Sequence, residues 1–155
     1  MLYTIVLSIH SVLRWLVVIA GLIAIVRAFS GWLGKKEWSA FDERLGIAFT
    51  SIFDLQVLVG LILYFFLSPI TTAALRNFGA AMGNSGFRFF SVEHILMMLV
   101  AMGVAHVGRS MSKKAVGSRA KFMRAALWFT LSFVILFFAI PWPFMAVARP
   151  WIRLG

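Results

Sequence analysis

Three histidines inside otherwise apolar stretches are the residues of this chain best suited to chemistry: His10, His94 and His106. Imidazole is a common metal ligand and exchanges protons near neutral pH. An ionisable group within an apolar span is costly, so it marks a candidate functional site. Two arginines lie close by in sequence: Arg14 follows His10 by four positions, on the same face of a helix, and Arg88 precedes His94. Which of these groups can act together depends on the elements that carry them.

The composition indicates a membrane protein. Hydrophobic residues make up 62% of the 155 positions and charged residues 13%, whereas soluble domains have about 25% charged residues. The mean hydropathy is +0.95. The net charge of +10 comes from short basic runs beside apolar stretches, the arrangement of loops at a membrane surface. We therefore expect the lipid bilayer as a partner and exclude nucleic acid.

The chain contains no cysteine. This excludes disulfides, iron–sulfur clusters, thiolate zinc sites and covalent attachment of c-type haem. The first five residues have neither a positive n-region nor a cleavage site, so the first span is expected to be a retained helix rather than a signal peptide.

Four apolar spans are each about as long as the roughly 20 residues that cross a bilayer: about 3–27, 45–67, 87–107 and 122–140. Their short connections predict an all-α transmembrane four-helix up-down bundle, a single integral membrane domain over residues 1–155. Residues 71–82, between the second and third spans, could form a short surface helix that caps the bundle. Small residues would let helices approach closely; the candidates are Ala20, Gly21, Gly60 and Gly103.

The distribution of basic residues predicts the orientation. The first and third connections and their flanks hold ten: Arg27, Lys35, Lys36, Arg44, Arg109, Lys113, Lys114, Arg119, Lys121 and Arg124. The opposite side holds four: Arg76, Arg88, Arg149 and Arg153. The positive-inside rule then places the first and third connections in the cytoplasm and both termini on the periplasmic side of a bacterial inner membrane, as a multi-pass protein.

Depth along the helices separates the histidines. With a rise of about 1.5 Å per residue, His10 and His94 each lie roughly 10 Å below the outer boundary, on two helices that both run inward. Two imidazoles at one level are what a b-type haem iron requires as axial ligands. His106 lies roughly 18 Å deeper than His94 and about 120° away around the helix, so these two cannot bind one metal.

The nearby charges suggest supporting roles. Arg88, Arg14 and also Arg76 are candidates to hold haem propionates, while Arg14 could instead neutralise Glu93. Asp54 could bond His106 or Gln56, or serve a proton path. Each histidine also has a structural interpretation as a hydrogen-bonded residue of the bundle, which is the favoured one for His106.

These residues also carry a resemblance. Residues 9–15, 55–64, 88–94, 108–114 and 140–142 resemble small bacterial membrane proteins described as cytochrome b-like. The resemblance implies haem b with His10 and His94 as ligands. Members of that family often have a histidine before the Leu–Gln pair, where this chain has Asp54, so the resemblance does not extend ligation to the second span. In layout the chain is also similar to four-helix membrane protoporphyrinogen oxidases, which bind haem.

Three interpretations remain open. The leading one is a b-type haem membrane protein in electron transfer, alone, as a homo-oligomer or as a small subunit of a larger complex, with quinone or a periplasmic carrier as redox partner. The second is a haem-dependent oxidase acting on a porphyrin or quinone. The third is a cofactor-free accessory subunit with structural histidines. The sequence does not decide whether the protein is an enzyme.

Overall fold

The structure, a computed structural model, describes residues 1–152, and within them all regular elements are helical. The elements follow one another as α1 (Leu2–Leu33), α2 (Ala40–Ile62), the π-helical turn η1 (Leu63–Leu67), α3 (Pro69–Arg76), α4 (Phe78–Met82), α5 (Ser85–Arg88), the π-helical turn η2 (Phe89–Glu93), α6 (His94–Lys114) and α7 (Ser118–Ala139). The all-α class is confirmed. Arg153, counted above for orientation, lies outside the described residues.

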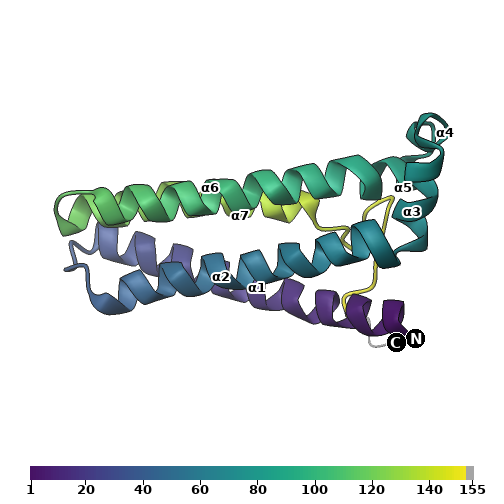
Figure 1. Cartoon of the computed structure of the whole chain (residues 1–155). Helices are drawn as coiled ribbons and strands as arrows, with labels where there is room; N and C mark the ends of the chain where they lie inside the picture. The colour runs from purple at the N-terminus through teal and green to yellow at the C-terminus, as the bar shows by residue number, and fades with distance from the viewer. Residues whose placement is uncertain (153–155) are drawn as a thin grey trace.

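Four continuous helical segments are long and apolar enough to cross a membrane: Leu2–Leu33, Ala40–Leu67, Ser85–Lys114 and Ser118–Ala139. Figure 1 shows them side by side, with the short helices α3, α4 and α5 gathered at the end where the chain begins. Helix α1 contacts α2 and α7, and α6 contacts α7 most extensively, whereas the contact between α2 and α6 is sparser. Helix α7 ends near the end that holds α3, and the segment after α7 lies at that end too.

The helices extend beyond the predicted spans at the end formed by the first and third connections. Arg27 on α1 pairs with Asp42 on α2, with 2.6 Å between Nε and Oδ1. Asp42 also accepts from the backbone N–H and hydroxyl of Ser39, which caps α2. Hydropathy ended the first span at Arg27 and left Asp42 in the connection, but their pairing lets both helices continue through these charged residues. The residues between α1 and α2 are only 34–39.

The predicted cap is built from several helical pieces. The expected helix over 71–82 is broken at Asn77, whose side chain accepts from the N–H of Ala80 and so starts α4. Ser68 similarly caps α3, where Pro69 occupies the first turn. These side-chain caps compete with helix continuation, so the connection folds as α3, α4 and α5.

Small residues bring the long helices together, although not all of the predicted ones do so. A Cβ on Gly21 would meet Phe133 at 2.9 Å and Phe49 at 3.0 Å, and Gly60 packs against His10. Gly103 brings no helices of this chain together, because it is exposed and has no atom within 4 Å of where its Cβ would lie. Hydropathy cannot tell a small residue between helices from one facing outward.

Candidate functional site

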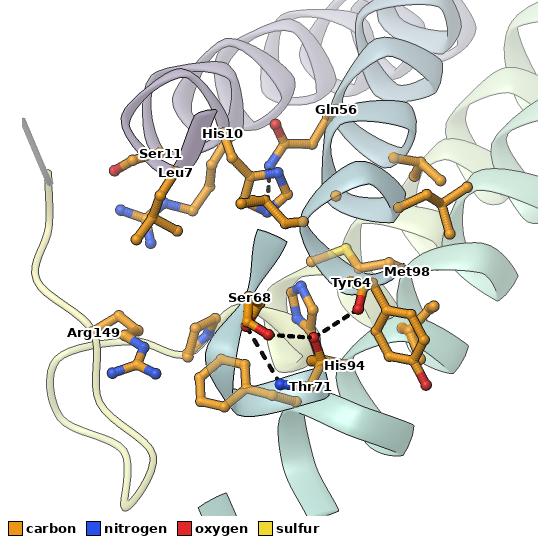
Figure 2. A pocket seen from close by; sticks show the side chains of 18 of the residues that line it. Leu7, His10, Ser11, Gln56, Tyr64, Ser68, Thr71, His94, Met98 and Arg149 are labelled. Carbon is orange, nitrogen blue, oxygen red and sulfur yellow. Dashed lines mark hydrogen bonds between the residues drawn. The ribbon is translucent and has the colours of Figure 1, made fainter. Parts of the chain in front are cut away.

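One cavity gathers His10, Arg14 and His94, three of the residues that the sequence singles out. It contains about 1180 Å³ of space outside the atoms, including its open mouth. Parts of α1, α2, η1, α3, η2, α6 and the segment after α7 form its wall. Figure 2 shows side chains from these elements pointing toward one another. Most of the lining is apolar, and its polar members include His10, Arg14, Gln56, Tyr64, His94 and Arg149.

His10 and His94 lie next to each other in this cavity. Their ring centroids are 6.5 Å apart and the ring planes meet at 73°. The prediction that these two residues lie at one level is therefore confirmed. Metal–imidazole bonds are about 2 Å long, and a ring centroid lies roughly 1 Å beyond its nitrogen. Two imidazoles on opposite sides of one metal ion would thus have centroids about 6 Å apart, close to the separation found here.

The end of α7 orients His94. Its Nδ1 lies 2.8 Å from the carbonyl oxygen of Ala139, the last residue of α7. The last carbonyls of a helix have no partner within that helix. Because a carbonyl can only accept, Nδ1 carries the proton and donates. The neutral ring then has its lone pair on Nε2, the tautomer that carbonyl-bound metal-ligating histidines use.

Helix α2 holds His10. The amide nitrogen of Gln56 lies 3.3 Å from its Nε2, and Gly60, one turn further along α2, leaves room for the ring: a Cβ there would be 3.1 Å from Cε1 of His10. The Nδ1 atom of His10 and the side-chain oxygen Oε1 of Gln56 are both buried, and neither has a hydrogen-bond partner among the described residues. A buried nitrogen without a partner is unusual and calls for a missing partner such as a ligand or water.

The two π-helical turns face each other at the cavity wall. The hydroxyl of Tyr64 in η1 donates to the carbonyl of Ser91 in η2, at 2.8 Å. Thr71 of α3 in turn donates to the carbonyl of Tyr64, at 2.7 Å. Because η2 ends at Glu93, directly before His94, the hydrogen bond from Tyr64 to Ser91 also holds the first residues of α6 in place. Single π-turns are often found at functional sites.

Two arginines line the cavity, and only one was predicted there. Arg14 donates to the carbonyls of Pro150 and Trp151, and the indole of Trp15 donates to the carbonyl of Trp151 at 2.8 Å. The segment after α7 is thereby held against α1. That contact brings Arg149 to the mouth, where its guanidinium carbon lies 4.5 Å from the ring centroid of Phe90.

The other predicted cations lie elsewhere. Arg88 pairs with Glu93, with 2.7 Å between Nε and Oε1, and does not line the cavity. Since Glu93 is taken by Arg88, the alternative pairing of Glu93 with Arg14 is wrong. Arg76, at the end of α3, is exposed and also outside the lining. Arg88 is close to His94 in sequence, but the π-helical turn η2 lies between them, and only the His94 side chain lines the cavity.

Asp54 and His106 form a separate pair. Nε2 of His106 lies 2.7 Å from Oδ1 of Asp54, which is one of the bonds considered for Asp54. Neither residue lines the cavity, so His106 does not share a ligand with His94. The predicted separation of these two histidines is confirmed.

The residues present fit a haem, although the described part of the chain has no cluster for a bare metal ion. No group of three or more His, Cys, Asp or Glu that could hold a metal gathers within residues 1–152. A haem iron differs, because the porphyrin supplies four nitrogens and the protein only one or two axial ligands. The free Nε2 of His94, the apolar lining and the arginines at the mouth suit a planar apolar ring with acidic substituents. Nδ1 of His10 would add a second lone pair when the Gln56 amide turns so that its unpartnered oxygen accepts from Nε2–H.

Sequence reasoning missed three contributors to this site. Gln56 was considered only as a possible partner of Asp54, although its place within an apolar run was a usable signal. Tyr64 gave no sign of its hydrogen bond. Arg149 could not be found, because nothing in the sequence shows that the segment after α7 folds back.

Comparisons with models of protein families, with curated proteins and with solved structures found no match.

Proposed function

We propose that this chain is an integral membrane protein that binds b-type haem and takes part in electron transfer. The observation that carries the proposal is the pair of imidazoles of His10 and His94, 6.5 Å apart on two different helices in one largely apolar cavity. Bundle cores that hold haem present ligands from facing helices in this way. Haem, when bound, would carry one electron at a time.

The surrounding residues have distinct tasks under this proposal. His10 and His94 would hold the haem iron. Ala139 fixes the tautomer of His94 through its carbonyl, and Gln56 holds the ring of His10. Arg149 and Arg14 would neutralise propionates at the mouth, which replaces the assignment of that role to Arg88.

The proposal includes an orientation. The four helices would cross a bacterial inner membrane in up-down order with both termini on the periplasmic side, because ten of fourteen flanking basic residues lie at the opposite end. The cavity would then lie near the periplasmic face. A periplasmic carrier or quinone is the redox partner that such a position suits, with the chain acting alone or as a small subunit of a larger complex.

Absorbance spectroscopy tests the proposal. The protein purified in mild detergent should show a reduced-minus-oxidised α-band of b type. His10→Ala and His94→Ala should each lose it, whereas His106→Ala, which removes a histidine outside the cavity, should keep it. Absence of haem in the well-folded wild-type protein, or retention of the band in both ligand variants, would refute the assignment.

The same preparation separates the alternatives. Oxidation of a porphyrinogen or quinol by the haem-loaded protein alone, without a partner, would favour an oxidase over an electron carrier. A stable, folded protein without haem would leave the cofactor-free accessory subunit.

A further inference from the structure

The pair formed by Asp54 and His106 lies on the outer surface of the bundle. The side chains are 48% and 42% exposed, although they meet at 2.7 Å. They come from α2 and α6, two helices with sparse contact. Apolar exposed side chains flank them, including Leu58 on α2 and Val107 on α6.

This position is unfavourable for a single chain in lipid. Asp54 lies ten residues beyond Arg44 along α2, which is about 15 Å at the helical rise. It therefore lies well inside the apolar span. Ionisable side chains at such depth almost always face protein or a water-filled space, because exposure to hydrocarbon is costly. Something should cover this face in the membrane.

The hydrogen-bonding atoms that remain indicate what covers it. Within the described residues, the pair uses Oδ1 of Asp54 and Nε2 of His106, and Oδ2 and Nδ1 have no partner. A two-fold axis would place Nδ1 of each His106 near Oδ2 of the other Asp54, since two-fold interfaces join a patch to itself. The two Asp54 carboxylates and the two His106 imidazoles then form a closed ring in which each carboxylate oxygen faces an imidazole nitrogen.

The surface beside the pair permits such an approach. Gly103 lies on α6 one turn before His106, is exposed and has open space where a Cβ would lie. Small residues at this kind of position let membrane helices pack closely. Neither the large cavity around His10 and His94 nor the small one beside Arg27 and Asp42 includes Asp54 or His106. A flat helix face therefore fits this surface better than a small ligand does.

We propose that the face of α2 and α6 around Asp54, His106 and Gly103 binds a second copy of this chain. The two copies are related by a two-fold axis and joined by reciprocal His106–Asp54 hydrogen bonds. This dimer goes beyond the haem assignment and does not depend on it, because the face lies outside the cavity.

Disulfide cross-linking in native membranes tests the dimer, and the absence of cysteine makes single-cysteine variants unambiguous. Under a mild oxidant, Gly103→Cys should yield a covalent dimer of twice 17.4 kDa. Val134→Cys, exposed on α7, is the matched control and should remain monomeric. A residue forms a disulfide with its own copy only if it lies close to the two-fold axis. Val100→Cys and Val107→Cys are therefore tested as well, on either side of Gly103 along α6.

A second variant tests the polar ring. In the cross-linking background that forms the dimer, Asp54→Asn should lower the cross-linked fraction on the order of tenfold at low protein density, because both reciprocal bonds weaken. Glu43→Gln on the same helix should leave it unchanged. Circular dichroism verifies that both variants are folded.

Three outcomes would overturn the proposal. They are no dimer at any of the three α6 positions, equal dimer at Val134→Cys, and a cross-linked product that contains another protein. Undiminished cross-linking of folded Asp54→Asn would refute the role of the ring.

Discussion

The three histidines have different environments although they are the same residue type. A backbone carbonyl at a helix end fixes the tautomer of His94, whereas a side-chain amide holds His10 and leaves its Nδ1 unpaired. His106 meets a carboxylate at the outer surface. A group that must bind a ligand needs a free nitrogen in a cavity, and only the first two have one.

Gly60 provides a test at the scale of a single residue. In Gly60→Ala the new methyl group would lie 3.1 Å from Cε1 of His10, so the ring must shift by a few tenths of an ångström. Overpacking of this kind costs about 1–3 kcal/mol, partly offset by the roughly 0.5–1 kcal/mol that alanine contributes in a helix. We expect lower haem occupancy and altered electron paramagnetic resonance g-values.

Gly79→Ala is the control for that substitution, because nothing lies within 4 Å of its added Cβ. It should change neither haem content nor spectrum. Identical behaviour of the two variants would show that His10 does not need the space that Gly60 leaves.

At the scale of elements, the two π-helical turns are the departure from regular helices that matters most for the cavity. Each adds a residue to a turn, which frees a backbone carbonyl and rotates the residues that follow. In this chain η1 and η2 are joined by the bond from Tyr64 to Ser91. We infer that this bond positions the beginning of α6 and hence His94.

Tyr64→Phe removes the hydroxyl that makes this hydrogen bond and keeps the aromatic ring. Because the carbonyl of Ser91 would lose its partner, we expect a loss of about 0.5–1.5 kcal/mol in stability, measured by denaturation in detergent. A shift of the haem midpoint potential should accompany it if the bond positions His94.

Tyr3→Phe serves as the matched variant, since Tyr3 also lines the cavity but has no hydrogen bond among the described residues. It should retain both stability and potential. A potential that moves equally in both variants would mean that the hydroxyls act through polarity alone rather than through position.

At the scale of the whole molecule, the charge asymmetry predicts the orientation in the membrane. Single cysteines at Lys36 and Lys114, both exposed at the basic end, should be shielded from a membrane-impermeant maleimide in intact cells. A cysteine at exposed Arg76, at the opposite end, should be labelled. The reverse pattern, with Arg76→Cys labelled only after permeabilisation, would contradict the proposed orientation.

Hydropathy and the helical rise predict the features that depend only on position along the chain. Four apolar runs predict four long helices, and a constant rise per residue puts His10 and His94 at one depth. The helix ends were less accurate, because Arg27 and Asp42 satisfy each other and let α1 and α2 continue past the apolar runs.

Tertiary structure decided which groups meet around the helix axes. The depth of a residue follows from counting residues along its helix. The direction in which its side chain points around the helix axis depends instead on helix packing and on the π-turns, and the position of Arg149 depends on how the segment after α7 folds. Arg88 therefore pairs with Glu93 outside the cavity, whereas Arg149, which no local pattern identifies, reaches its mouth. The sequence by itself determined that two imidazoles share a level; only the packed helices decided that both open into one cavity and that His106 faces outward.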